Sequence, residues 1–444
     1  MASPARSKKL RVLLFPFFAT SHIGPFTDPA FHLVTARPGV VEATVAVTPA
    51  NASVVRSALA RRGPIAGVTV QVATYPFPAV DGLPSGVENL STVAAADAWR
   101  IDKAAWDENL MRPGQEALIR ECLPDAIITD VHFIWNVDVA ADLRVSCVMF
   151  HVIDTFSTLA ITNLLSGGVH DASGSEVTVP GFPSPDIRVP ITELPEFLRS
   201  GEIIPPHLPC WALSLSSLSS AGASIDNDSQ CIRWLDTKPT QSVVYLCFGS
   251  LTHVSEVQLR ELALGLEASG KFFLWVVRAN AWTPPEGWKE RVGGRGMVVT
   301  GWAPQIAILA HPTVGALVTH CGWNSVMETI AAGVPVLTWP MVVEQFITER
   351  FVTEVLGIGE RLWPEGAGVR STKSEEHELI PAEAVARSVA RFMEPGGSGD
   401  AARSKVKELS AKAHAAMAEG GSSHHDLRRL IDDLIKERTA GVAV

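Results

Sequence analysis

Short runs of consecutive apolar residues alternate along the chain with longer segments of helical periodicity. Runs as short as these, rich in β-branched residues and bounded by turn residues, are typical of parallel strands that are buried on both faces. In the first half the expected strands are 12–15, 41–48, 68–73, 125–130 and 145–150. A long helical segment is expected over 94–123, and the helix after the first strand is expected to begin around Pro25.

The same alternation begins again in the second half. The expected strands are 242–248, 272–277, 297–300, 314–319 and 336–339. The expected helices are 254–268 (with Val257, Leu262 and Leu266 facing inward), 326–332, 344–356 and three further helical runs that end near Lys436. Two alternating halves predict two doubly wound α/β domains facing each other across a cleft.

A polar run lies between an expected strand and an expected helix, at residues 320–325. Gly322 allows a tight backbone there, and Asn324 and Ser325 are favourable residue types for a helix N-cap. The N-terminus of a helix carries free N–H groups and partial positive charge, which suit a phosphate. His320 adds a donor at the end of the strand. The pattern predicts a site for a diphosphate.

Side chains on both sides of this run match the other parts of a nucleotide sugar. Trp302 offers a flat face for a base, and Gln305 and Glu328 offer partners for a ribose. Glu344 and Gln345 follow a further strand and can bind sugar hydroxyls. Each residue alone is more often structural, a tryptophan for packing and a glutamate for solvation. Their joint order favours a binding site.

The segment 302–345, WAPQIAILAHPTVGALVTHCGWNSVMETIAAGVPVLTWPMVVEQ, resembles the signature box of plant family 1 UDP-dependent glycosyltransferases. The resemblance implies the GT-B fold of two Rossmann-like domains, with the donor bound mainly by the C-terminal one. It implies that uracil stacks on Trp302 and pairs with the Ala303 backbone, and that Gln305 and Glu328 bind the ribose. It further implies contacts of His320, Asn324 and Ser325 with phosphate, and of Trp323, Glu344 and Gln345 with the sugar. Gly322 is counted with them among the UDP-sugar-binding residues. Many relatives carry Asp at the position of Glu344.

Two titratable residues follow the ends of N-terminal strands, where open α/β sheets bind ligands. His22 follows the first strand, and Asp130 ends the fourth. His22 suits general-base catalysis, and Asp130 can orient its imidazole. Alternatively, His22 only caps the next helix and Asp130 is a structural N-cap. Ser250 lies in the turn after the first strand of the second half and is expected to contact the donor.

Composition narrows the range of partners. The net charge of −10 argues against nucleic acid, and no stretch is apolar enough to span a membrane. Six widely spaced cysteines favour a reducing compartment, so we expect a cytoplasmic protein.

Asp226 and Asp228 weakly match a metal-binding pattern and are interpreted as a turn. We therefore expect no metal site and no cofactor, with UDP-glucose as co-substrate.

The predicted domains are an acceptor-binding domain over 1–225, a donor-binding domain over 226–425, and a C-terminal helix over 426–444 that packs back on the first domain. One departure from the family lies between about 198 and 211, where roughly one βα unit that relatives carry is missing. The sequence leaves open whether this reflects a natural deletion or a gene-model error.

Together these features predict an inverting glucosyltransferase that uses UDP-glucose and a small hydrophobic acceptor, with His22 as base and Asp130 behind it. A flavonoid, a phenylpropanoid, a hormone or a xenobiotic all remain open as acceptors. One alternative is a catalytically impaired UDP-sugar-binding protein, because of the missing segment. A less favoured one is a nucleotide-sugar epimerase. The absence of a GxGxxG motif after a strand argues against a dinucleotide-binding enzyme.

Overall fold

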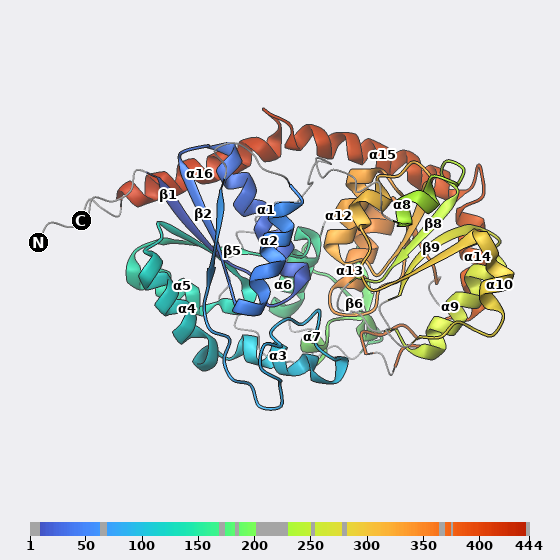
Figure 1. Cartoon of the computed structure of the whole chain (residues 1–444), viewed down its shortest axis with the longest axis horizontal. Coiled ribbons are helices and arrows are strands. Elements are labelled where there is room, and N and C mark those ends of the chain that lie inside the picture. The colour runs from blue at the N-terminus through green and yellow to red at the C-terminus, as the bar shows by residue number, and fades with distance from the viewer. Residues whose placement is uncertain are drawn as a thin grey trace, which may run out of the picture. The chain divides into compact units, whose positions relative to one another are not determined.

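The structure of the chain is a computed structural model (Figure 1). It describes residues 9–62, 69–167, 174–182, 186–200, 230–249, 254–277, 282–363, 369–373 and 376–440. Its contacts divide the chain into two compact units. Among the described residues, the first comprises those of 9–152 and 415–440, and the second comprises those of 153–200 and 230–414. This division differs from the predicted domain boundaries in two places: the described residues of 153–200 belong to the second unit, and residues 415–425 belong to the first.

The first unit is built on a parallel sheet with the strand order β3-β2-β1-β4-β5. Its strands are β1 (Leu10–Phe15), β2 (Val41–Val47), β3 (Val70–Thr74), β4 (Ala126–Asp130) and β5 (Ser146–Phe150). All five expected strands are therefore present, within two residues of the predicted bounds. The order reverses between β1 and β4, which pair directly with each other. In open α/β sheets, ligands bind outside the strand ends at such a reversal.

Helices cover both faces of this sheet, because alternate strand residues point to opposite faces. Leu10, Val12 and Leu14 pack in one core and Leu13 and Phe15 in another. The first core contains residues of α1 (Thr20–Ala36), α2 (Ala52–Ala60) and α16 (Ser422–Ala440), the C-terminal helix that lies beside α1 (Figure 1). The second core contains residues of α3 (Ala98–Trp106), α4 (Glu108–Cys122) and α5 (Trp135–Leu143).

The second unit contains a six-stranded parallel sheet with the order β10-β9-β8-β11-β12-β13. Its strands are β8 (Val243–Cys247), β9 (Phe272–Val277), β10 (Gly296–Thr300), β11 (Val314–Thr319), β12 (Val336–Thr338) and β13 (Gly359–Arg361). When the strands are numbered in chain order within this sheet, the order is 3-2-1-4-5-6, which is that of a Rossmann sheet. The two sheets confirm the predicted fold class. The short strand β13 was not predicted.

The faces of this second sheet are also covered by helices. One core contains residues of α9 (Glu256–Ser269), α10 (Trp288–Val292) and α14 (Ala382–Phe392). The other contains residues of α8 (Gln230–Leu235), α11 (Gln305–Leu309), α12 (Trp323–Ala332) and α15 (Ser398–Met417). The remaining elements are α6 (Thr155–Ser166), β6 (Glu176–Thr178), β7 (Arg188–Pro190), α7 (Glu196–Ser200) and α13 (Gln345–Arg350), which continues as a π-helix over Phe351–Val355.

Several expected element boundaries were wrong, each for a local reason. The helix expected over 94–123 is divided at Asp107, whose extended backbone interrupts it and whose side chain accepts from two N–H groups of α4. Helix α1 begins at Thr20 rather than near Pro25, because the Ala19 carbonyl accepts from the N–H groups of His22 and Ile23. Val257 is exposed, although the sequence pattern placed it inward.

No described helix combines the length and apolar composition that a membrane span requires.

Candidate functional site

The switch point of the first sheet brings His22 and Asp130 together. Asp130 is the last residue of β4, and His22 lies in the first turn of α1, the helix that follows the neighbouring strand β1. The His22 Nδ1 lies 2.8 Å from the Asp130 Oδ2. The Asp130 side chain is 1% exposed, whereas His22 retains 14% exposure. The pair therefore consists of a buried carboxylate and an imidazole that solvent, or a ligand, can reach.

The buried Asp130 carboxylate remains ionised. Burial alone would raise its pKa, but attraction by His22 and His132, together with hydrogen bonds from both, holds the Asp130 pKa well below its usual range. An ionised carboxylate fixes the proton of His22 on Nδ1, because that nitrogen must donate to it. The lone pair of His22 is then on Nε2, as a general base requires.

A residue that the sequence analysis missed completes this cluster. The His132 Nδ1 lies 2.6 Å from the other oxygen of Asp130, Oδ1. Phe17 donates its backbone N–H to Oδ2 over 3.3 Å. The available signal was the spacing Asp-Val-His, since a residue two positions after a strand-terminal Asp folds back toward its carboxylate in a tight turn.

In the second unit the polar run does form a strand-to-helix turn. Strand β11 ends at Thr319, Cys321 adopts a positive φ of 67°, and α12 begins at Trp323. The N-cap is Gly322, without a side-chain cap, so Asn324 and Ser325 are not caps as expected but lie in the first turn. Backbone N–H groups rather than side chains dominate this helix end, which is the arrangement that suits a phosphate.

His320 is packed between two glycines at the switch point of the second sheet, where β8 and β11 pair. A Cβ placed on Gly249 would lie 2.5 Å from the imidazole, and one placed on Gly322 would lie 2.4 Å from it. Burial lowers the pKa of His320 to about 4, and its Nδ1 is buried without a hydrogen-bond partner among the described residues. Ser250, the other residue predicted beside this turn, lies outside the described residues.

Hydrogen bonds link three of the predicted donor-site residues. The Gln305 Nε2 donates to the Ser325 Oγ over 3.0 Å and to the Glu328 Oε2 over 2.7 Å. The Tyr245 hydroxyl donates to the Gln305 Oε1 over 3.2 Å. Beside them, Ala303 is buried, whereas Trp302 is 66% exposed. The structure thus brings the expected base and ribose residues together.

The sugar-binding candidates lie at the start of α13. Both Glu344 and Gln345 are buried. The Gln345 Oε1 accepts from the backbone N–H groups of Met341 and Val342 at 2.9 and 3.0 Å. Trp323, the third candidate, lies tilted against Phe351 in the π-helical continuation of α13, with ring centroids 6.2 Å apart. Because the Gln345 oxygen is occupied by the loop, its Nε2 is the atom that remains for a sugar hydroxyl.

A second carboxyl that the sequence analysis did not identify influences Glu344. Burial raises the pKa of Glu344 to about 7, and repulsion by Asp154 adds to this effect. Asp154 is itself buried, accepts from the Ser157 N–H over 2.6 Å and accepts from the Thr348 hydroxyl over 2.9 Å. Its only sequence signal was an N-cap position before α6.

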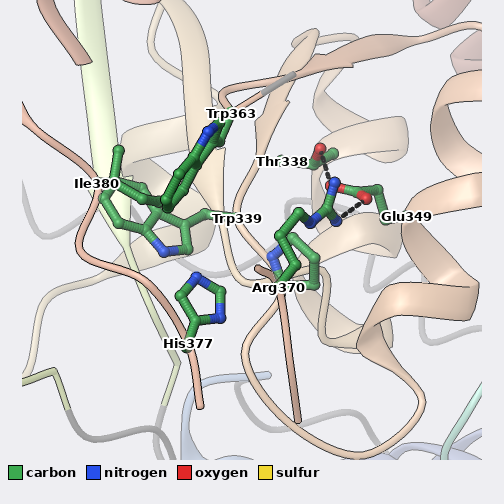
Figure 2. A pocket seen from close by; sticks show the side chains of 8 residues that line it. Thr338, Trp339, Glu349, Trp363, Arg370, His377 and Ile380 are labelled. Carbon is green, nitrogen blue, oxygen red and sulfur yellow. Dashed lines mark hydrogen bonds and ion pairs between the residues drawn. The ribbon is translucent and has the colours of Figure 1, made fainter. Parts of the chain in front are cut away.

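A small pocket in the same unit lies beside the strand that leads into this loop (Figure 2). Thr338 and Arg370 both bond to Glu349 there, while His377 and Trp363 lie on its other side (Figure 2). Arg370 also pairs with Glu193 at 3.3 Å, and Arg350 pairs with Glu193 at 2.7 Å. These paired charges anchor β12, and therefore the loop that carries Glu344 and Gln345, rather than offering an unpaired binding group.

The family model described as UDP-glucuronosyl and UDP-glucosyl transferase matches residues 225–360. Scopoletin glucosyltransferase from Nicotiana tabacum is 33% identical, over 98% of this chain and 99% of the relative. UDP-glucose flavonoid 3-O-glucosyltransferase 7 from Fragaria ananassa is 32% identical, over 98% of each.

Solved structures show the same architecture. The structure of Glycyrrhiza uralensis UGT73P12 in complex with glycyrrhetinic acid 3-O-monoglucuronide matches with a TM-score of 0.82 and 27% identity, over 98% of this chain and 97% of that chain. Medicago truncatula UGT71G1 in complex with UDP-glucose matches with a TM-score of 0.74 and 24% identity, over 96% and 98%. At that identity the second match supports the fold alone.

Proposed function

The chain belongs to the UDP-glucuronosyl and UDP-glucosyl transferase family, and we propose that it transfers glucose from UDP-glucose to a hydroxyl group of a small hydrophobic acceptor. Relatives whose names give scopoletin and flavonoids as acceptors support this acceptor class. The observation that carries the catalytic part is the hydrogen bond of 2.8 Å between His22 and Asp130 at the switch point of the first sheet.

The proposed reaction is a single displacement. An acceptor hydroxyl is a weak nucleophile until its proton leaves, and the His22 Nε2 takes that proton as the oxygen attacks the anomeric carbon. Asp130 stabilises the imidazolium that forms and keeps it in the correct tautomer. The bond from the anomeric carbon to UDP breaks on the opposite face. An α-linked donor therefore gives a β-glucoside, UDP and one proton.

The second unit supports departure of UDP. Negative charge develops on the diphosphate as the bond breaks, and the N-terminus of α12 supplies N–H groups and partial positive charge. His320 stands beside this helix end. We propose that these groups bind the diphosphate, that Trp302, Ala303, Gln305 and Glu328 bind the nucleoside, and that Trp323, Glu344 and Gln345 bind the sugar.

We propose that no metal ion and no cofactor is needed. A helix end and an imidazole already provide the electrostatic stabilisation that a cation would supply at the diphosphate. The net charge of −10 supports the absence of nucleic acid as a partner. Widely spaced cysteines, five of which are free among the described residues, support a cytoplasmic location.

Product formation from UDP-glucose with a panel of phenols tests this function. We expect transfer by the parent chain, unchanged by EDTA. Replacement of His22 by Ala should lower kcat by about 10²–10⁴-fold while UDP binding survives, because only the base is lost. UDP binding without transfer to any phenol would instead favour the UDP-sugar-binding protein. Interconversion of nucleotide sugars would favour the epimerase.

A further inference from the structure

The carboxylate that orients the proposed base is shared by a second histidine. Asp130 accepts from the His22 ring through Oδ2 at 2.8 Å and from the His132 ring through Oδ1 at 2.6 Å. The His132 backbone N–H also donates to Oδ1, over 3.3 Å. His132 therefore holds one oxygen with two donors, which fixes the plane of the carboxylate and the direction of the oxygen that faces His22.

The His132 ring is itself held in place by aromatic contacts. It stacks on Phe17 with ring centroids 4.0 Å apart and planes inclined by 9°. On another side it contacts Trp106 of α3, with centroids 4.6 Å apart. A ring packed in this way cannot rotate freely, so its hydrogen bond to Asp130 is preorganised rather than formed by chance at a mobile surface.

The distances identify this cluster as hydrogen-bonded rather than metal-binding. His22, Asp130 and His132 form the group of metal-capable side chains found among the described residues. Two ligands of one tetrahedral zinc ion, each bound at about 2.0–2.1 Å, lie roughly 3.3 Å apart. The nitrogen–oxygen distances of 2.6 and 2.8 Å are shorter and match charge-assisted hydrogen bonds.

We propose that His132 is a positioning residue of the glycosyl-transfer reaction: it holds Asp130 through Oδ1, so that Oδ2 keeps the imidazole of His22 oriented toward the acceptor. This role rests on the proposed function of His22 as the base. His132 needs no contact with the acceptor to act, because its effect passes through the carboxylate. Loss of its hydrogen bond leaves Asp130 free to turn and leaves a buried oxygen with one donor fewer.

Two substitutions separate the hydrogen bond from the packing. His132→Phe keeps an aromatic ring on Phe17 and Trp106 but removes the donor, whereas His132→Asn keeps a donor in the place of Nδ1. We expect His132→Phe to lower kcat by about 10-fold, at the lower end of the effect of losing a hydrogen bond to a charged group. The KM for UDP-glucose should stay within about two-fold, since donor binding is not involved. His132→Asn should recover most of kcat.

A double-mutant cycle tests whether the effect passes through Asp130. In an Asp130→Asn background, His132→Phe should change kcat by less than about two-fold, because residues that act as a unit are not additive. If the effects of Asp130→Asn and His132→Phe on kcat multiply, the positioning role of His132 is overturned. An equal loss of kcat in His132→Phe and His132→Asn would overturn it as well. Inhibition of the parent by added zinc that His132→Phe abolishes would also overturn it, in favour of a metal site.

The two proposals fail in different ways. A parent chain that transfers no sugar to any phenol overturns the proposed function, and the role of His132 in that reaction with it. An active parent whose kcat is unchanged by His132→Phe overturns only the role of His132.

Nitrogen NMR of the imidazole rings in the full chain tests the hydrogen bond without measuring turnover, because it reports which ring nitrogen carries the proton. We expect the His132 proton on Nδ1 and expect Asp130→Ala to release it, whereas a proton on Nε2 in the parent would contradict the shared carboxylate.

Discussion

The packing of His320 between Gly249 and Gly322 leaves no room for a side chain at either glycine. A Cβ on Gly322 would lie 2.4 Å from the imidazole Nε2, closer than any van der Waals contact, so the buried ring would have to move. We expect Gly322→Ala to weaken UDP binding by about 10-fold, roughly the value of one charge-assisted hydrogen bond. Isothermal titration with UDP measures this.

Gly294 provides the matched control for this substitution. A Cβ there meets nothing within 4 Å, and the residue belongs to the same unit. Gly294→Ala should leave UDP affinity unchanged. Equal affinities of the Gly322→Ala variant and the parent would show that His320 does not contribute to the diphosphate site.

Burial of Glu344 makes stability depend on pH in a defined direction. Its pKa rises from 4.5 to about 7 in the folded state. The folded chain therefore retains a proton that the unfolded chain loses, so this stabilisation is complete below about pH 4.5 and is lost as pH rises through 7. At about 1.4 kcal/mol per pKa unit, the contribution of Glu344 to the free energy of unfolding has an upper limit of roughly 3 kcal/mol.

Thermal melting as a function of pH measures this effect. Glu344→Gln should remove the part of the decline between pH 4.5 and 7 that belongs to Glu344. His320 acts in the opposite direction: because burial lowers its pKa from 6.5 to about 4, its contribution is complete above pH 6.5 and is lost as pH falls. Replacement of the exposed Glu256 by Gln is the control. A parent-like pH dependence in Glu344→Gln would contradict the assignment.

At the scale of elements, the loop before α13 depends on Gln345. The Gln345 Oε1 accepts from the N–H groups of Met341 and Val342, so the side chain supports the loop as well as facing the proposed sugar site. Gln345→Leu should lower the free energy of unfolding by about 1 kcal/mol, because two partly buried N–H groups lose their acceptor. It should also raise the KM for UDP-glucose.

Melting temperature and donor KM together test this double role. Gln71→Leu, an exposed substitution on β3, controls for the change of residue type. If Gln345→Leu raised the donor KM without lowering the melting temperature, Gln345 would bind the sugar without supporting the loop.

Strands were predictable because apolar runs buried on both faces leave a strong signal in the sequence. All ten expected strands are present near their predicted bounds, and β11 is buried along its whole length as expected. Helix starts were less predictable, since they depend on backbone contacts such as those of the Ala19 carbonyl. The strand β13 is three residues long and only partly buried, so it carries too little pattern to be recognised.

At the scale of the whole molecule, both candidate sites lie where a sheet reverses its strand order. His22 follows β1 and Asp130 ends β4, while Gly249 and His320 follow β8 and β11. The order of elements therefore predicted which residues meet. It could not reveal His132 or Asp154, because their importance comes from side-chain contacts rather than from any periodicity.

It stays a prediction that this chain lacks a segment that its relatives carry. The region expected to hold it, between about 198 and 211, lies almost wholly outside the described residues, as do Asp226 and Asp228. The alignment with the tobacco relative spans 489 positions, whereas this chain has 444 residues, so the relative carries residues that have no counterpart here.

The distribution of charge across the second unit predicts the preferred donor. The segment 302–345 contains no Arg or Lys, and Glu344 and Asp154 place two acidic groups by the proposed sugar site. Arg350 and Arg370 are both paired with Glu193. A glucuronate carboxylate would therefore meet acidic groups and no unpaired cation among these residues. Galactose, whose 4-hydroxyl is axial, would leave part of the Glu344 and Gln345 pair unsatisfied, at a cost of about 1–3 kcal/mol or roughly 5- to 150-fold.

We accordingly expect UDP-glucose to be preferred over UDP-galactose and UDP-glucuronate. The measurement is kcat/KM for the three donors with one accepted phenol, because this ratio reports discrimination between competing substrates. Gln345→His should narrow the gap between glucose and galactose if the Gln345 Nε2 contacts the sugar. Equal values for the three donors, or a preference for glucuronate, would contradict the roles assigned to Trp323, Glu344 and Gln345, while the His22 and Asp130 chemistry would stand, since it acts on the acceptor and not on the sugar.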